Sequence, residues 1–438
     1  MTALAVAAFG LAWWLGLYLL ARDPRRPLLR RAGAGLLAYA LAVACAALAD
    51  LAPGLALREI EEVLVCLPPL AWAGAVIHLL PAGPGRDRLD RGWQAVALGL
   101  VVAVPLLPSP ARIVVLAPLA VATVLLGLAW RRVRPRGVPG PVIVAVLLFE
   151  LGLGALLLPL DVLPHWLLLG AVGLDLAVLG LAVAWYDAFA QGEQVRADLR
   201  RSLLAATATA LLFGGQVGAA VLVAGRTPAL VGLLFGTVAA AIAVVVLAGP
   251  VQALLDRLAF PTADELRRER GELRRAEAAL PRRPEHVRLA ELETDEFDRL
   301  TRRALSNYAD LGKLVASPLT DLPVIDRRLA ARGAPADQPL ERAAELKAVL
   351  RESIGRLKPH DGDFGTTDEW RHYNALYYCY VVGIRPHRRR ITPDGLDPDA
   401  RRALEWFSRY VPERTLHNWQ NAAARLVAAD LRADLSQE

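Results

Sequence analysis

The chain has 438 residues, of which 55% are hydrophobic and 21% charged, and its mean hydropathy is +0.35. In the first 250 residues the apolar residues gather in runs of about 18 to 22, the length of a membrane-spanning helix. This distribution excludes an ordinary soluble protein and predicts a polytopic membrane protein with a water-compatible last third. The net charge of +6 comes largely from arginine, which is typical of cytoplasmic loops.

Nine runs are long and apolar enough to span a membrane. The first run, Ala3 to Ala21, is followed rather than preceded by basic residues, which is the reverse of a secretory signal peptide and favours a retained span. We expect an all-α fold, with a nine-helix membrane bundle at 1–250, a charged connector helix at 251–290 and a helical domain at 291–438. The expected spans are 3–21, 33–52, 62–81, 93–108, 112–130, 141–159, 166–186, 202–224 and 229–249.

The basic residues of the loops alternate along the chain. Arginines are dense in the loops after the first, third, fifth and seventh spans, whereas the other loops carry only Arg58, Arg112 or Arg226. Basic loops lie on the cytoplasmic side of a membrane. The pattern therefore predicts an N-terminus outside, a C-terminus inside and a location in the inner (cytoplasmic) membrane.

Three ionisable residues fall inside predicted spans: Glu150, Asp175 and His78. A charge at that depth is costly, so such groups are normally paired or functional. Glu150 and Asp175 are candidates for a proton or cation site, and so for an ion-coupled transporter. The alternative is that they are protonated and hydrogen-bond a neighbouring helix. No inverted repeat is evident, which weakens the transporter interpretation.

Acidic residues also gather between the second and third spans, at Asp50, Glu59, Glu61 and Glu62. They form either a mouth for a cationic ligand or a solvated rim.

Two further features bear on helix packing. Gly214 and Gly218 make a GxxxG pattern in the eighth span, which allows close approach of helices. Pro68 and Pro69 in the third span predict a kink, because proline lacks the amide hydrogen that a helix interior uses.

The connector after the ninth span repeats leucine every seven residues, at Leu266, Leu273 and Leu280. A sustained heptad needs a second apolar position, which here is filled by Ala263, Arg270 and Glu277. The segment is therefore either a short homodimer contact or a charged, solvated helix.

The sequence around the last two spans resembles a known arrangement. DAFAQGEQVRADLRRSLL, two spans, VQALLDRL and a charged helix are similar to the membrane exit of bacterial multi-span sensor proteins, including sensor histidine kinases. His286 lacks a phospho-acceptor context and no glycine-rich ATP box follows it. The resemblance implies a sensor that reports by something other than phosphorylation.

The last 148 residues read as short amphipathic helices. Trp370, Tyr373, Leu376 and Tyr380 form an aromatic stripe, which indicates core packing.

Near the end, Asp397 precedes a helix ARRALEWFSRYV, and a turn PERT leads into a second helix, LHNWQNAAARLVAADL. Two helices joined by a tight turn are typical of a helix-turn-helix, in which asparagine, glutamine and arginine read base edges. The candidate DNA-binding residues are Arg388, Arg389, Arg390, Arg414, His417, Asn418, Gln420, Asn421 and Arg425.

This half also resembles a known module. The blocks LTRRALSNYADLGKLVASPL, LRESIGRLKP, EWRHYNALYYCYVVGI and PERTLHNWQNAAARLVAADL are similar to a bacterial helical module that ends in a sigma-region-4-like helix-turn-helix. The segment before the turn is longer than in that module, so the resemblance implies either DNA binding or a partner protein. The matching residues are Trp370, Tyr373, Leu376, Tyr380, Arg414, Thr415 and Ala424.

No catalytic motif is present: the sequence has no Walker A loop, no G-x-S-x-G and no H-E-x-x-H. We therefore expect no enzyme activity, no cofactor and no metal site.

The sequence predicts a membrane-tethered sensor or regulator in contact with membrane lipid. Its helix-turn-helix-like output domain binds DNA in the first interpretation and a cytoplasmic protein in the alternative, and the connector supplies a candidate homodimer contact.

Overall fold

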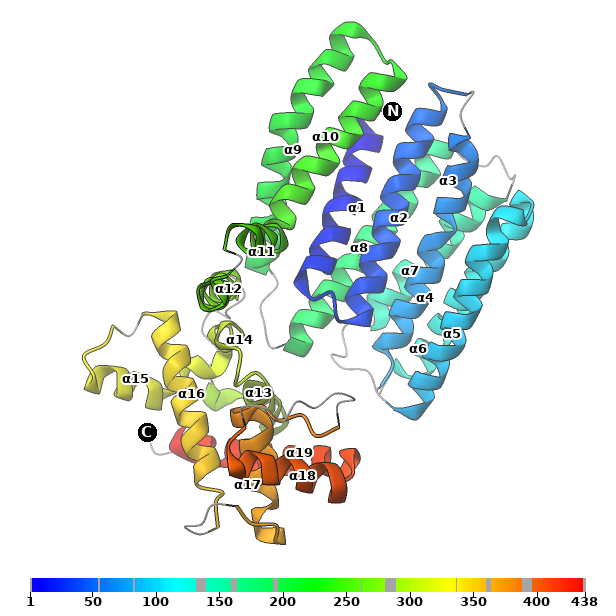
Figure 1. Cartoon of the computed structure of the whole chain (residues 1–438). Helices are drawn as coiled ribbons and strands as arrows, with labels where there is room; N and C mark the ends of the chain where they lie inside the picture. Colours follow the sequence, from blue (N-terminus) through cyan, green and yellow to red (C-terminus); the bar gives the residue numbers. More distant parts are fainter. Residues whose placement is uncertain are drawn as a thin grey trace. The chain divides into compact units, whose positions relative to one another are not determined.

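The computed structural model describes residues 2–53, 56–81, 83–130, 139–158, 164–191, 196–260, 262–279, 289–335, 337–359, 364–387 and 396–435. Within these ranges every regular element is a helix (Figure 1). The chain forms two compact units. The first comprises Met1–Phe189 and Asp198–Ala259, and the second comprises Ala190–Ala197 and Phe260–Glu438.

Nine helical segments in the described part of the first unit are long and apolar enough to cross a membrane, which agrees with the number predicted from the sequence. One of them combines two helices, and two others include short 3-10 turns. The helices of this unit are α1 (Thr2–Arg22), α2 (Pro27–Ala49), α3 (Leu57–Val65), α4 (Leu67–Leu79), α5 (Pro84–Ala103), η1 (Val104–Leu106), η2 (Ser109–Leu116), α6 (Ala117–Leu128), α7 (Pro139–Leu157), α8 (His165–Gln191), α9 (Arg196–Ala224), α10 (Pro228–Val246) and α11 (Ala248–Ala259).

The predicted irregularity of the third span is present as an interruption. Helix α3 ends at Val65 and α4 begins at Leu67, with Cys66 between them. Pro68 and Pro69 lie in the first turn of α4, where a missing amide hydrogen costs no helical hydrogen bond. The prolines therefore start a new helix rather than bend a continuous one.

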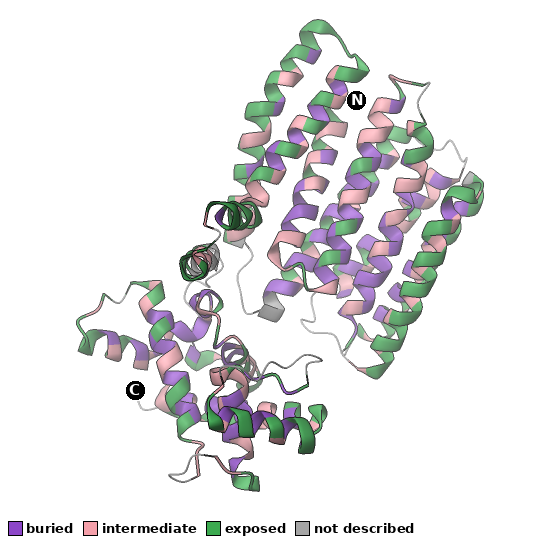
Figure 2. Cartoon of the chain, in the orientation of Figure 1, coloured by how far each residue is buried: buried purple, intermediate pink, exposed green. Residues whose placement is uncertain are grey.

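Helices α1, α2 and α8 pack closely against one another. A Cβ added at Gly33 would lie 2.8 Å from the carbonyl oxygen of Gly16, so α1 and α2 touch through their backbones. A Cβ at Gly180 on α8 would lie 2.6 Å from Leu15 on α1 and 3.1 Å from Leu36 on α2. Figure 2 shows buried residues concentrated on α1, α2 and α4, whereas α5 and much of α9 are exposed.

The second unit is a bundle of short helices around one core. The predicted connector, 251–290, is shared between the units, because α11 belongs to the first and the separate helix α12 to the second. Its residues 280–288, including Leu280, lie outside the described ranges. The helices of this unit are α12 (Asp264–Ala279), η5 (Leu289–Glu291), α13 (Thr294–Ser306), α14 (Leu311–Val315), η6 (Pro318–Asp321), α15 (Pro323–Ala331), α16 (Pro339–Gly355), η7 (Asp368–Trp370), α17 (Arg371–Leu376), the π-helix η8 (Tyr377–Val382), α18 (Pro398–Tyr410) and α19 (Glu413–Leu435).

The aromatic stripe of the second unit is core. Trp370, Tyr373 and Leu376 are buried, and Tyr380 is partly buried against the same core. A π-helix continues the stripe and ends at Gly383, whose φ of +88° a residue with a side chain rarely adopts. The next helix, α18, begins as predicted, because the Asp397 carboxylate accepts a hydrogen bond of 2.6 Å from the amide of Ala400.

Burial in this core should make Cys379 unreactive. Burial raises the pKa of the Cys379 thiol to about 12, so almost none of the nucleophilic thiolate is present at pH 8. We expect alkylation of Cys379 by iodoacetamide, followed by peptide mass spectrometry, to be about a thousandfold slower in the folded protein than after denaturation. Equal rates in the two states would contradict the packing described here.

Candidate functional site

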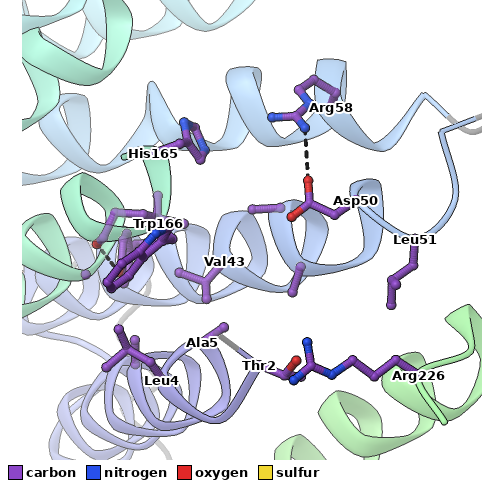
Figure 3. Close-up of a pocket in the computed structure, with 16 residues that line it drawn as sticks. Thr2, Leu4, Ala5, Val43, Asp50, Leu51, Arg58, His165, Trp166 and Arg226 are labelled. Carbon is purple, nitrogen blue, oxygen red and sulfur yellow. Dashed lines mark hydrogen bonds and ion pairs between the residues drawn. The ribbon is translucent and has the colours of Figure 1, made fainter. Parts of the chain in front are cut away.

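A cavity of about 290 Å³ lies between α1, α2 and α8 in the first unit (Figure 3). The space exists because the facing positions hold small residues, namely Ala5 and Ala8 on α1, Ala46 and Ala47 on α2, and Gly170 on α8. Larger side chains there would close the cavity. The remaining wall is mainly apolar, which favours the apolar part of a ligand.

Tyr39 forms the inner wall of the cavity and fixes α2 against α8. Its hydroxyl group donates a hydrogen bond of 2.6 Å to the carbonyl oxygen of Leu169. One turn further along α8, Gly173 packs directly on the Tyr39 ring, where any Cβ would overlap the phenol. The position of Tyr39 is therefore set by both a polar and a steric contact.

The rim of the cavity carries charge. Arg58 donates a hydrogen bond of 3.1 Å to Asp50, and Arg226 lies beside Thr2 on another part of the rim (Figure 3). The structure records no ion pair for Arg226 among the described residues. Asp50 offsets the charge of its partner Arg58, so Arg226 is the guanidinium group of the rim that faces an incoming ligand. The cavity is thus an apolar space with the Arg226 guanidinium group at its entrance.

Next to the rim, the acidic residues predicted between the second and third spans are held by bases. The Glu61 carboxylate lies 2.7 Å from Nε2 of His165, and Arg112 is paired with Glu62. Arg112 also donates hydrogen bonds to the carbonyl oxygens of Val104 and Leu107, at 3.2 and 3.0 Å. With Asp50 paired to Arg58, three of the four acids have a basic partner; the fourth, Glu59, is exposed.

His78 belongs to a different cluster, near the other end of α2. Its Nδ1 lies 3.0 Å from both the Arg31 guanidinium and the carbonyl oxygen of Gly74. Asp90 forms an ion pair with Arg31, whose guanidinium also stacks 4.1 Å above the Trp93 ring. His78 is therefore part of a partly buried network that joins α2, α4 and α5.

Glu150 and Asp175 are partly buried on α7 and α8. Among the described residues, no hydrogen bond or ion pair joins either acid to the other or to His78, and Glu150 Oε1 is a buried atom without a hydrogen-bond partner. The structure therefore does not assemble the three predicted intramembrane residues into one site.

A third charged cluster was not anticipated from the sequence. The Asp187 carboxylate at the end of α8 accepts hydrogen bonds from Arg22 at 2.8 Å and from Arg26 at 2.5 Å. Beside it, the Tyr18 hydroxyl donates a hydrogen bond of 2.7 Å to Asp198 at the start of α9. The hydrogen bonds of Asp187 join residues more than 160 positions apart in the sequence. No local sequence pattern could therefore indicate this cluster.

The structure separates the predicted DNA-binding residues into three groups. Gln420 donates a hydrogen bond of 3.5 Å to the carbonyl oxygen of Ala375, and Asn421 accepts one of 3.2 Å from Arg302, so both amides are engaged within the unit. Residues 388–390, the three predicted arginines, lie outside the described ranges. The remaining four are exposed on one side of α19: Arg414, His417, Asn418 and Arg425.

The opposite side of α19 belongs to the core. Leu416, Ala423 and Val427 are buried along it, and the Trp419 ring stacks on Trp406 of α18 with 6.0 Å between the ring centroids. This helix is therefore amphipathic, and its apolar face holds the unit together while its polar face is exposed.

The chain matches no family model, no curated protein and no solved structure. In the part of the chain that the structure describes, no three His, Cys, Asp or Glu residues gather in a way that could hold a metal ion. The cavity residues Tyr39, His165 and Arg226 were not singled out as site residues from the sequence. Arg226 was visible there only as the one basic residue of its loop.

The fit between Gly173 and Tyr39 gives a test of the cavity wall. We expect Gly173→Ala to displace the Tyr39 ring and to destabilise the protein by about 1–3 kcal/mol, as overpacking does. Thermal unfolding of the purified protein measures the change. Gly99→Ala on α5 is the matched control, because a Cβ there meets nothing within 4 Å. An equal effect of the two substitutions would contradict the contact.

Proposed function

We propose that this protein is a multi-pass membrane receptor that binds a small amphipathic acid in the cavity between α1, α2 and α8. The observation that carries the proposal is the cavity itself, an apolar space of about 290 Å³ with Arg226 at its rim. Mainly apolar pockets with a few placed polar groups are the usual form of small-molecule sites. The apolar part of the ligand fills the space, and its acidic group stays at the rim near Arg226.

The distribution of charge supports an arrangement in which the rim faces the outside. The cavity rim lies at the end of the bundle that has few basic residues, whereas Arg22, Arg26 and Arg31 lie at the other end of α1 and α2. Cytoplasmic ends of spans are enriched in arginine. We therefore propose nine crossings of the inner membrane with the second unit in the cytoplasm.

The helices that form the cavity also offer a route for a signal. At one end α1 and α8 line the cavity, and at the other end they are joined by Arg22 and Asp187. A ligand that shifts α1 against α8 must change this ion pair, because both side chains are buried and fixed. The geometry of this ion pair would therefore differ between the ligand-bound and the ligand-free state.

Ligand binding is tested with octanoate and decanoate added to the full chain in nanodiscs. We expect a rise in stability that reaches about 2.7 kcal/mol at a hundred times the dissociation constant, measured by thermal unfolding. Gly170→Leu, which fills the cavity, should abolish the rise. Gly236→Leu on α10 is the matched control, because the space beside Gly236 is open and it is not part of the cavity.

The contribution of the acidic group is separated by using octanol as the matched ligand. Arg226→Gln should reduce the preference for octanoate over octanol and leave the binding of octanol unchanged. Stabilisation that persists in Gly170→Leu would place the ligand elsewhere. No stabilisation of the wild-type chain by either acid would remove the support for this ligand class.

The exposed face of α19 favours DNA binding as the output of the receptor. Arg414, His417, Asn418 and Arg425 follow one another at helical spacing and are all exposed. On the neighbouring helix, Arg401, Arg402 and Arg409 are also exposed, although Arg402 is paired with Asp399. Asparagine and arginine on one helix face are suited to bases, and the flanking arginines to phosphates.

This second proposal is tested by DNA titration of the full chain at two salt concentrations. Binding should weaken steeply with salt, and Arg414→Ala/Asn418→Ala should cost about 1–3 kcal/mol per lost base contact. Arg351→Ala, an exposed arginine on α16, is the control and should change little. Binding that ignores the double variant would indicate only a basic surface. No binding would favour a protein partner, for which Tyr410 and Leu426 are exposed on α18 and α19.

A further inference from the structure

A second and larger cavity of about 610 Å³ lies between α1, α9 and α10. Its wall is apolar and rich in small residues, and among the described residues that line it Arg226 is the only charged one. Thr2 and Arg226 line this cavity as well as the smaller one, so the two spaces share one section of rim. The other residues that line the larger cavity do not line the smaller one.

The cavity is elongated along the helices. On α1 its lining runs from Thr2 to Trp14, about 18 Å at the helical rise of 1.5 Å per residue, and on α9 from Leu203 to Leu222, about 29 Å. The hydrocarbon core of a bilayer is about 30 Å thick, so a lipid acyl chain, which crosses one leaflet, fits within this length. An apolar space of this length is therefore suited to the hydrocarbon chain of a lipid.

The two glycines of the GxxxG pattern on α9, and Gly215 beside them, have different roles. A Cβ at Gly214 would lie 2.6 Å from Val238, so Gly214 allows α9 and α10 to touch. A Cβ at Gly215 or Gly218 would meet nothing within 4 Å, and both residues line the cavity. One glycine thus closes the helix pair, while the other two leave the adjoining space empty.

The position of Arg226 completes the match to a lipid. Arg226 follows the end of α9, beyond the apolar length of the cavity, and the structure records no ion pair for it within the described ranges. A guanidinium group at that height is suited to the phosphate of a head group. We propose that this cavity holds one acyl chain of an anionic phospholipid, whose phosphate binds Arg226.

Native mass spectrometry of the full chain, released from nanodiscs of equal parts phosphatidylglycerol and phosphatidylcholine, tests this inference. The wild-type protein should retain one phospholipid, with phosphatidylglycerol favoured about fivefold, the effect of one cation at a membrane surface. Arg226→Gln should retain a phospholipid and lose the preference. Gly218→Leu and Gly215→Leu, which fill open space, should lose the lipid, and Gly236→Leu is the matched control that should keep it.

Four outcomes would overturn the proposal. The first is a wild-type protein without a retained phospholipid, and the second is equal retention in the wild-type, Gly218→Leu and Gly215→Leu proteins. The third is a bound fatty acid in place of a phospholipid. The fourth is a wild-type dimer that Gly218→Leu converts to a monomer, which would assign the cavity to a second copy. Thermal unfolding of the same samples shows whether each variant is folded, with Gly236→Leu as the reference.

Discussion

The first unit depends on the Asp187 carboxylate, which two arginines from α1 and the following loop share. The side chains of Asp187 and Arg22 are only 4% and 2% exposed. Removal of one partner from such a buried pair leaves an uncompensated charge and costs several kcal/mol. The contact joins residues 165 positions apart, so it fixes the first helix of the bundle against the seventh span. The pairing of Tyr18 with Asp198 then adds the start of α9, a helix that is otherwise little buried.

The bundle combines tight contacts with unfilled space, and glycine and alanine serve both purposes. Gly16 and Gly33 let the backbones of α1 and α2 meet, and Gly173 admits the ring of Tyr39. On the same helices, small side chains leave the two cavities open. Close contacts on one side of a helix hold it rigidly enough for space to persist on the other, since a loosely packed helix would collapse into the gap.

Sequence reasoning was strongest where a pattern is local. Length and hydropathy predicted nine apolar helices, and the spacing of Trp370, Tyr373 and Leu376 predicted a core face. Prediction from the sequence was weakest where the surroundings of a side chain depend on which helices become neighbours. Gly214 and Gly218 belong to one motif and yet face different surroundings, and no property of the sequence separates them. Gln420 and Asn421 likewise have the composition of a base-reading face, but the neighbouring helices α17 and α13 engage their side chains.

Arg226 lies on the rim of both cavities, and one cation cannot neutralise two anions at full strength. The two proposed ligands would therefore be thermodynamically linked, and by reciprocity each would weaken the binding of the other by the same factor when both are acidic. The apparent affinity for a small acid would then depend on the composition of the surrounding bilayer. If both proposals hold, such a chain would measure a soluble molecule against the lipid that competes with it.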